Sequence, residues 1–298
     1  MNSVSSSRTK SILVTGASTG IGHGTAAAFL ARGYRVFGTV RKASDAESLK
    51  DRFGERFEPL AFDVTDGRAI EAEIARMAAR LDDGALDGLV NNAGIALPGP
   101  VAEQPFDDVR RMFEVNFFGL LQVTRACLPL LGMRAGHRAP PGRIVNVSST
   151  VGKMSPPFLG TYAASKHAVE GISNSLRREL LPWNISVVVV GPGSVKTPIW
   201  GKGVNESAYD HTSFRNVYRR FVKLMLEEEK KGMTADHIAE LLVKIMESPR
   251  PKTRYAPVAH KFANWTLPRL LTDRQFDKLI YKTLGMEKEP RVELTRGR

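Results

Sequence analysis

Short apolar runs alternate with stretches of mixed polarity over most of the chain. Runs such as SILVTG and ISVVVVGPG are nearly all apolar and end at glycine, which predicts strands buried on both faces. We expect strands at residues 11–16, 34–40, 57–64, 85–94, 142–149, 185–193 and 253–259.

The stretches between these runs repeat apolar residues every three or four positions, the spacing of one helical face. Residues 66–82 show it most clearly, at Ile70, Ile74, Met77 and Leu81. Strands that alternate with helices over this length predict an α/β fold, a doubly wound parallel sheet with helices on both faces. We expect helices at 21–33, 43–54, 66–82, 107–131, from 160 onward, 214–232 and 235–248.

The chain shows no linker between its parts, so we predict one domain over residues 1–298, with a core at about 10–260. An extension rich in Phe, Trp and Leu follows at 261–298. The polar N-terminus lacks the apolar stretch of a secretory signal, and no run approaches the ~20 apolar residues of a spanning helix. Cys127, the single cysteine, lies in an apolar helical run and is expected to be a packing residue. These features predict a cytoplasmic protein.

The 298 residues carry a net charge of +12. A positive net charge favours a negatively charged partner: nucleic acid, an anionic membrane or a phosphate-bearing ligand. A soluble surface with surplus Lys and Arg explains the charge equally well. We find no nucleic-acid recognition motif, so no nucleic-acid partner is expected, whereas peripheral contact with a membrane stays open. The six histidines show no metal-ligand spacing, and no metal site is expected.

The turn TGASTGIG connects the first strand to the first helix. Its glycines let the backbone approach a pyrophosphate at a helix N-terminus, although glycines in such turns are often only structural. The expected contacts are Gly16, Ser18, Thr19, Gly20, Ile21 and Gly22.

The end of the second strand distinguishes between the two nicotinamide cofactors. An acid at this place bonds the ribose hydroxyls of NAD. Here the strand ends with Arg41 and Lys42, whose charges suit the 2′-phosphate of NADP(H), so NADP(H) is favoured over NAD(H). The alternative is a solvated basic pair. Asp63 and Val64 at the third strand end are expected near the adenine, and Asp63 would otherwise be an ordinary cap residue.

Four motifs occur in order along the chain: TGASTGIG, NNAG, Ser149 in NVSSTVG, and YAASK at 162–166. Tyr162 is thirteen residues after Ser149. This set resembles the short-chain dehydrogenase/reductase family over roughly residues 10–200, and more weakly to about 260. The sequence is similar to the branch that contains 17β-hydroxysteroid and retinol dehydrogenases. The resemblance implies a Rossmann-type fold and an NAD(P)-dependent oxidoreductase that interconverts a carbonyl and an alcohol.

The resemblance also implies roles for individual residues. Tyr162 would be the proton donor or base, Lys166 would hold the nicotinamide ribose and lower the Tyr162 pKa, and Ser149 would bond the reacting oxygen. Asn116 would hold a water of the proton relay; alternatively it bonds a backbone carbonyl. The cofactor would be lined further by Asn92, Ala93, Gly94, Pro192, Gly193, Val195 and Thr197.

The chemistry of these residue types agrees with the implied roles. A carbonyl that accepts hydride develops negative charge on oxygen and needs a proton donor. A phenol has a pKa near ~10, and a neighbouring ammonium favours its ionised form. Tyr162 and Lys166 lie four residues apart on one helical face. Ser148 is an equally good hydroxyl, and only the spacing to Tyr162 favours Ser149.

In this family the segment after the PG turn covers the substrate, here at about 198–232. Its aromatic residues predict a lipophilic substrate, steroid- or retinoid-like, although a core-facing or oligomer-forming helix explains the same stripe. By analogy with the family we expect a homodimer or homotetramer. The main rival is a catalytically silent NADP-binding sensor on the same fold.

Overall fold

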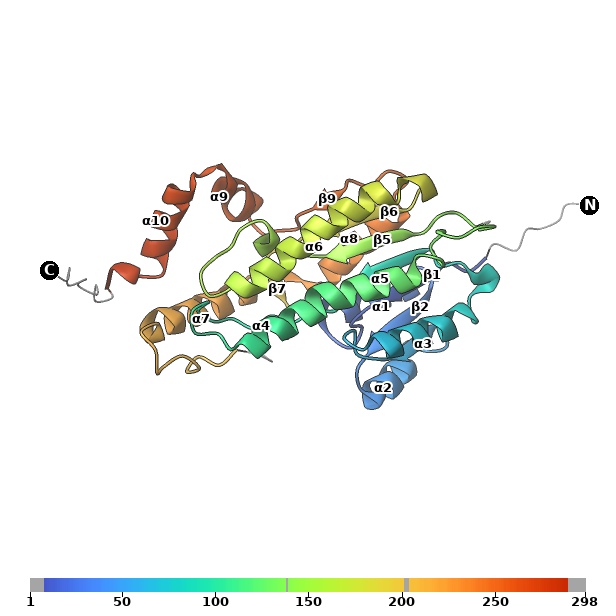
Figure 1. Ribbon diagram of the computed structural model, residues 1–298, viewed down its shortest axis with the longest axis horizontal. Coiled ribbons are helices and arrows are strands. Elements are labelled where there is room, and N and C mark those ends of the chain that lie inside the picture. Colours follow the sequence, from blue (N-terminus) through green and yellow to red (C-terminus); the bar gives the residue numbers. More distant parts are fainter. Residues whose placement is uncertain (1–7, 138, 201–203, 289–298) are drawn as a thin grey trace, which may run out of the picture.

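The computed structural model describes residues 8–137, 139–200 and 204–288. Seven parallel strands form its sheet, in the order β3-β2-β1-β4-β5-β6-β9 (Figure 1). The strand order reverses direction next to β1, as the doubly wound prediction requires, and the predicted fold class is confirmed. The strands are β1 Ser11–Val14, β2 Arg35–Val40, β3 Phe57–Ala61, β4 Gly88–Asn91, β5 Arg143–Val147, β6 Ser186–Val190 and β9 Arg254–Tyr255.

Helices cover both faces of the sheet. Successive side chains of β1 point to opposite faces of the sheet, which explains the two layers. Ile12 and Val14 belong to one apolar cluster, and Leu13 belongs to the other. The first cluster includes side chains of α1 Gly20–Ala31, α2 Ala43–Phe53 and α8 Ala235–Glu247. The second includes side chains of α3 Gly67–Ala78, α5 Leu120–Cys127 and α6 Gly160–Glu179.

The predicted helix at 107–131 is not one regular α-helix. It consists of α4 Phe106–Phe113, a π-helical segment Glu114–Gly119 and α5. Gly119 lies against Val64, where a Cβ atom would be 2.7 Å from the Val64 carbonyl oxygen. The widened turn therefore lies at the end of β3, next to the expected cofactor site, as π-helical turns commonly do.

A third apolar cluster covers the carboxyl edge of the sheet. It joins α7 Arg215–Lys230 to Phe158, Tyr162 and Tyr209. Beneath it, β7 Val195–Lys196 pairs with β8 Met233–Thr234 in a second, two-stranded sheet that the sequence pattern did not predict. This cluster includes apolar side chains of the predicted lid between residues 199 and 226, while residues 201–203 of that lid lie outside the described residues.

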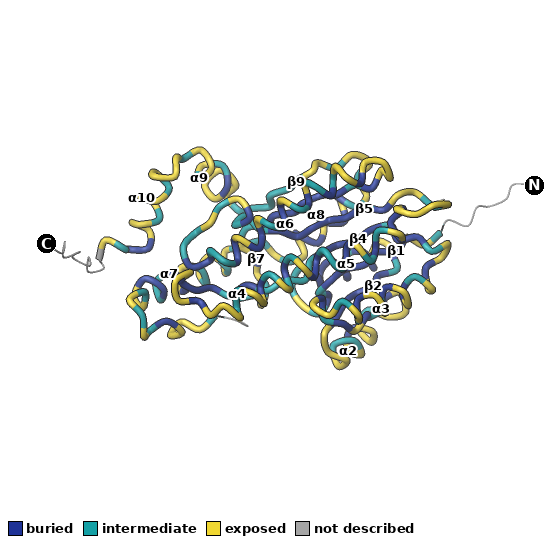
Figure 2. The backbone as a smooth tube through the Cα atoms, viewed as in Figure 1, coloured by how far each residue is buried: buried dark blue, intermediate teal, exposed yellow. Residues whose placement is uncertain are grey.

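The C-terminal extension forms a separate arm at one end of the molecule (Figure 1). It contains a π-helical turn Phe262–Thr266, α9 Leu267–Leu270 and α10 Asp273–Thr283. Figure 2 shows that most of α9 and α10 is exposed. Within the described residues, no helix has the length and apolar character needed to cross a membrane.

Candidate active site

The carboxyl ends of β1, β4, β5 and β6 bring the sequence motifs to one edge of the sheet. Two adjoining clefts lie there. The first runs from the glycine turn past the ends of β2 and β3, and the second contains Ser149, Tyr162 and Lys166. Of the predicted site residues, Gly22, Lys42 and Asn116 line neither cleft.

The glycine turn requires glycine at three positions. Gly16 and Gly20 have φ angles of +70° and +58°, in the left-handed region that favours glycine. At Gly22 a Cβ atom would be 2.1 Å from the Gly16 carbonyl oxygen. The cap residue Thr19 makes no side-chain hydrogen bond to the first turn of α1. The backbone N–H groups of that first turn are therefore available to an anion. The turn therefore fits a pyrophosphate.

Gly22→Ala is expected to cost about 1–3 kcal/mol of unfolding free energy, because the new methyl group would overlap backbone. NADPH binding should weaken in parallel, since the turn must move. Urea unfolding and NADPH titration measure the two effects. Gly171→Ala is the matched control: it lies within α6 with open space around its Cα, so alanine should stabilise the helix by about 1 kcal/mol. An unchanged Gly22→Ala protein would contradict the assigned close approach.

Arg41 lines the first cleft at the end of β2, as does Asp63 after β3. Lys42 is exposed and stands at the N-cap of α2, away from the lining. The Asp63 carboxylate accepts hydrogen bonds from the backbone and the hydroxyl of Thr65, at 3.0 and 2.9 Å. Asp63 is thus a turn-forming residue that also faces the cleft, so both interpretations of it remain compatible with the structure.

Asn92 joins the turns that follow β1 and β4. Its side-chain amide donates to the Thr15 carbonyl at 2.9 Å, while the backbone N–H of Asn92 and of Ala93 donate to the Thr15 hydroxyl. Asn116 similarly exchanges two 2.9 Å hydrogen bonds with the backbone of Ile95 and donates to Ser165 at 3.0 Å. Asn116 therefore holds the loop after β4 against α6, consistent with the backbone-bonding alternative.

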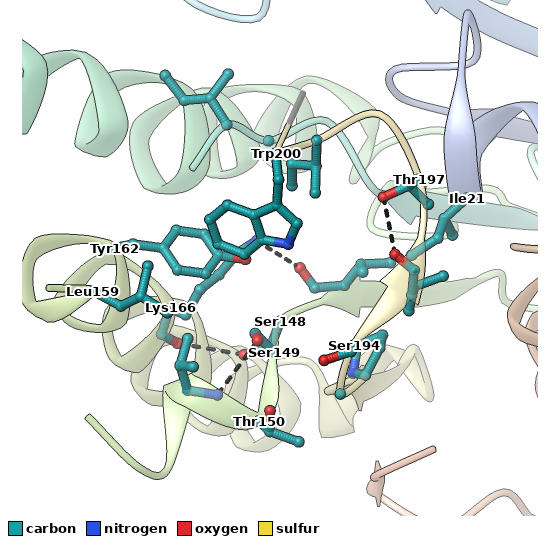
Figure 3. Close-up of a pocket in the computed structure, with 18 of the residues that line it drawn as sticks. Ile21, Ser148, Ser149, Thr150, Leu159, Tyr162, Lys166, Ser194, Thr197 and Trp200 are labelled. Carbon is teal, nitrogen blue, oxygen red and sulfur yellow. Dashed lines mark hydrogen bonds between the residues drawn. The ribbon is translucent and has the colours of Figure 1, made fainter. Parts of the chain in front are cut away.

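Ser149 and Tyr162 face each other across the second cleft (Figure 3). The Ser149 hydroxyl accepts a hydrogen bond from the Val151 backbone N–H at 3.3 Å and is close enough to Tyr162 to act on the pKa of its phenol. Ser148 instead directs its hydroxyl toward the Lys166 carbonyl, at 3.5 Å, and is buried. The Trp200 ring lies edge-on to the Tyr162 ring with centroids 6.0 Å apart, so Tyr162 is only 6% exposed.

Lys166 is buried with its ammonium group bonded to the Val147 carbonyl at 3.0 Å and 5.9 Å from the Tyr162 ring centre. Burial lowers the pKa of Lys166 to about 8, against the opposing effect of Glu170. Burial raises the pKa of Tyr162 to about 12, and Ser149 opposes this rise. Lys166 is not among the groups that shift the Tyr162 pKa, so the lowering expected from it stays a prediction. Tyr162 is therefore a protonated phenol at neutral pH.

The sequence interpretation missed several residues of the clefts. Trp200 belongs to the predicted lid at 198–232, but the sequence does not indicate that its ring lies against the Tyr162 ring. Arg111 and Val115 line the first cleft from α4 and the π-helical segment. Arg111 and Val115 are four residues apart, so they lie on one face of the helix, and Val115 directly precedes Asn116. This spacing could have indicated both residues. Others in this group include Thr39, Ile95, Leu97, Met225 and Glu228.

Comparison with known proteins places this geometry in a family. The family described as short chain dehydrogenase matches residues 10–207. The NADPH-dependent 3-dehydrocapnine reductase of Ornithobacterium rhinotracheale is 37% identical over 273 residues, 91% of this chain and 96% of that protein. Retinol dehydrogenase 7 of Rattus norvegicus is 31% identical over 268 residues, 85% of this chain and 82% of that protein.

Solved structures agree. The closed form of serine dehydrogenase complexed with NADP+ has a TM-score of 0.69 and 26% identity, over 83% of this chain and 93% of that chain. The match in sequence covers well over half of the chain, and the fold resembles that of a solved enzyme over most of both chains. The predicted resemblance is confirmed: the protein belongs to the short-chain dehydrogenase family and is an oxidoreductase.

Proposed function

We propose that this protein is an NADP(H)-dependent oxidoreductase that interconverts a lipophilic carbonyl compound and its alcohol, with Tyr162 as acid and base. The observation that carries the proposal is the cleft in which Ser149, Tyr162 and Lys166 meet beside the glycine turn. The test is NADPH oxidation and NADP+ reduction by the purified protein, measured against matched steroid, retinoid and simple aromatic carbonyl/alcohol pairs. Absence of turnover with every pair, together with normal NADPH binding, would instead favour a nucleotide sensor.

The chain's own groups account for the proton chemistry of reduction. NADPH, when bound, supplies the hydride that reduces the carbonyl carbon. Ser149 holds the carbonyl oxygen by a hydrogen bond from its hydroxyl. The Tyr162 phenol, whose pKa burial raises, carries a proton at neutral pH and transfers it to that oxygen. Lys166, one helical turn away, places a positive charge beside the phenolate that remains. Oxidation of the alcohol reverses these proton movements.

The cofactor is NADP(H). Arg41 at the end of β2 lines the cleft where an NAD-selective site carries an acid. The relative from Ornithobacterium rhinotracheale is named for NADPH, and the serine dehydrogenase structure is a complex with NADP+. The prediction from Arg41 therefore agrees with both comparisons.

Arg41→Ala is expected to weaken NADPH binding on the order of tenfold to a hundredfold, the worth of a hydrogen bond to a charged phosphate. NADH binding should hardly change, because NADH lacks the 2′-phosphate. Calorimetric titration with both nucleotides measures the difference. Lys42→Ala is the control, because Lys42 lies outside the cleft lining and should have the smaller effect. Equal weakening of NADPH and NADH by Arg41→Ala would contradict the role of Arg41.

An apolar wall supports a lipophilic substrate. Around the Ser149–Tyr162 pair, the cleft is lined by Val151, Leu159, Ile199, Trp200 and Met225. One relative is named for retinol, an apolar alcohol. We also expect a homodimer or homotetramer, for which the exposed Phe118 on the π-helical segment is a candidate contact.

A further inference from the structure

The chain has a strong charge bias where it leaves the sheet. Residues 248–272 contain five Lys and Arg residues and no Asp or Glu. This segment runs through β9 and the π-helical turn to the end of α9. It encloses part of a cavity of about 240 Å³ that is separate from the two clefts described above. Its lining is Lys153, Arg254, Ala256, Lys261, Trp265 and Arg269.

Trp265 organises this cationic pocket. Its buried ring lies between two guanidinium groups, 4.6 Å from Arg254 and 4.7 Å from Arg269. Only one carboxylate is in contact with the lining cations within the described residues: Glu170 pairs with Arg254 at 3.0 Å and with Lys153 at 3.4 Å. Because Glu170 is one charge against four, the pocket keeps an excess of positive charge.

Two of these cations are free to bind something else. Over the part of the chain that the structure describes, Lys261 and Arg269 form no ion pair, and both are exposed. A cationic pocket with available ammonium and guanidinium donors suits an oxyanion such as a phosphate group.

Exposed apolar side chains stand on the same short segment. Phe262 is 67% exposed and Leu270 72% exposed, and Leu267 lies between them at 40%. Two of them are next to pocket residues in sequence, since Phe262 follows Lys261 and Leu270 follows Arg269. Figure 2 shows the arm that carries them as mostly exposed. Cations beside exposed large apolar residues are the composition of a surface that binds an anionic lipid interface.

We propose that residues 261–270, together with Lys153 and Arg254, dock the enzyme on a bilayer that contains anionic phospholipid. The headgroup phosphate enters the cationic pocket, and Phe262 and Leu270 insert at the level of the acyl chains. Charge decides against a second copy of the chain as the occupant, because a symmetric contact would bring two cationic pockets together. The proposal stands apart from the assigned catalytic chemistry.

Cosedimentation of the full-length protein with vesicles tests the headgroup pocket. We expect binding to phosphatidylcholine vesicles that contain about one-third phosphatidylglycerol and little binding to pure phosphatidylcholine. The double variant Lys261→Gln/Arg269→Gln should bind about thirtyfold more weakly, because each Lys or Arg near an anionic surface contributes about fivefold. Lys261→Arg/Arg269→Lys keeps the charge and should bind like the native protein.

A matched control removes two cations elsewhere. Lys50→Gln/Arg52→Gln on the exposed end of α2 makes the same change in net charge and should bind like the native protein. If the two glutamine double variants lost vesicle binding equally, the proposed role of the pocket would be overturned, because net charge alone would then explain binding. NADPH turnover without vesicles should be unchanged in all variants, which shows that each one is folded.

A second arm tests insertion and the source of the phosphate. Phe262→Ser/Leu270→Ser should weaken vesicle binding by at least about tenfold, whereas Phe106→Ser, an equally exposed aromatic on α4, should not. Binding of inorganic phosphate without binding to vesicles would overturn the lipid assignment in favour of a free anion. Self-association through the arm, lost in the serine double variant and without vesicle binding, would overturn it in favour of a second copy.

Discussion

Tyr162→Phe should lower kcat for carbonyl reduction by about 10²- to 10⁴-fold, the usual contribution of a positioned general acid. The substitution removes one oxygen atom and keeps the ring. The edge-on contact with Trp200 and the packing against the third apolar cluster are therefore retained. Stability and NADPH affinity should stay close to native, so the loss would belong to proton transfer. Steady-state kinetics with NADPH titration measures both.

Tyr209→Phe is the control for this experiment. Tyr209 is a buried tyrosine of the same apolar cluster, and it lines neither cleft. Removal of the Tyr209 hydroxyl should leave kcat within about twofold of native, since Tyr209 takes no part in the proposed proton transfer. If Tyr162→Phe kept kcat within tenfold of native, another group would have to be the donor and the assignment would fail.

The parallel sheet could be predicted because its strands are continuous apolar runs closed by turn residues, from SILV in β1 to SVVVV in β6. The second sheet could not, because β7 and β8 contain two residues each and show no period. The π-helical segment escaped for a different reason. Its apolar spacing is that of an ordinary helix, and the close approach of Gly119 to Val64 is visible only in the folded chain.

The proposed catalytic groups could be selected from sequence because Ser149 lies thirteen residues before Tyr162 of YAASK. Trp200 follows from no such spacing, since only folding brings it over the Tyr162 ring. The raised pKa of Tyr162 is likewise a property of the packed cluster. Sequence shows that Lys166 is four residues away, but not that both groups lose their contact with water. Local spacing thus identifies the groups, and tertiary burial sets their pKa values.

Glu170 and Arg254 connect the catalytic helix to the edge of the sheet and to the C-terminal arm. Glu170 lies one helical turn beyond Lys166 on α6 and is 3% exposed. The Arg254 guanidinium makes three hydrogen bonds of 3.0–3.1 Å to its carboxylate. β9 otherwise joins the sheet through only two residue pairs with β6. Arg254 therefore stabilises both the last strand and the arm that begins after it.

Arg254→Met should lower the free energy of unfolding by about 3 kcal/mol, because it leaves the buried Glu170 carboxylate without its main partner. We expect a loss at the low end for a broken buried ion pair, since Lys153 still contacts Glu170 at 3.4 Å. Urea unfolding followed by circular dichroism measures the loss. Lys252→Met, exposed in the same segment, is the control and should change stability by less than about 0.5 kcal/mol.

The double variant Glu170→Leu/Arg254→Met separates a stranded charge from lost packing. Replacing both members of a buried pair with apolar residues removes the desolvated charge, so much of the stability should return. A loss below about 1 kcal/mol in Arg254→Met would show that the pair behaves like a solvent-screened surface pair. A large loss in Arg254→Met that the second substitution does not relieve would assign the effect to Trp265, whose ring contacts the guanidinium at 4.6 Å. The expected order of stability is native, then the double variant, then Arg254→Met.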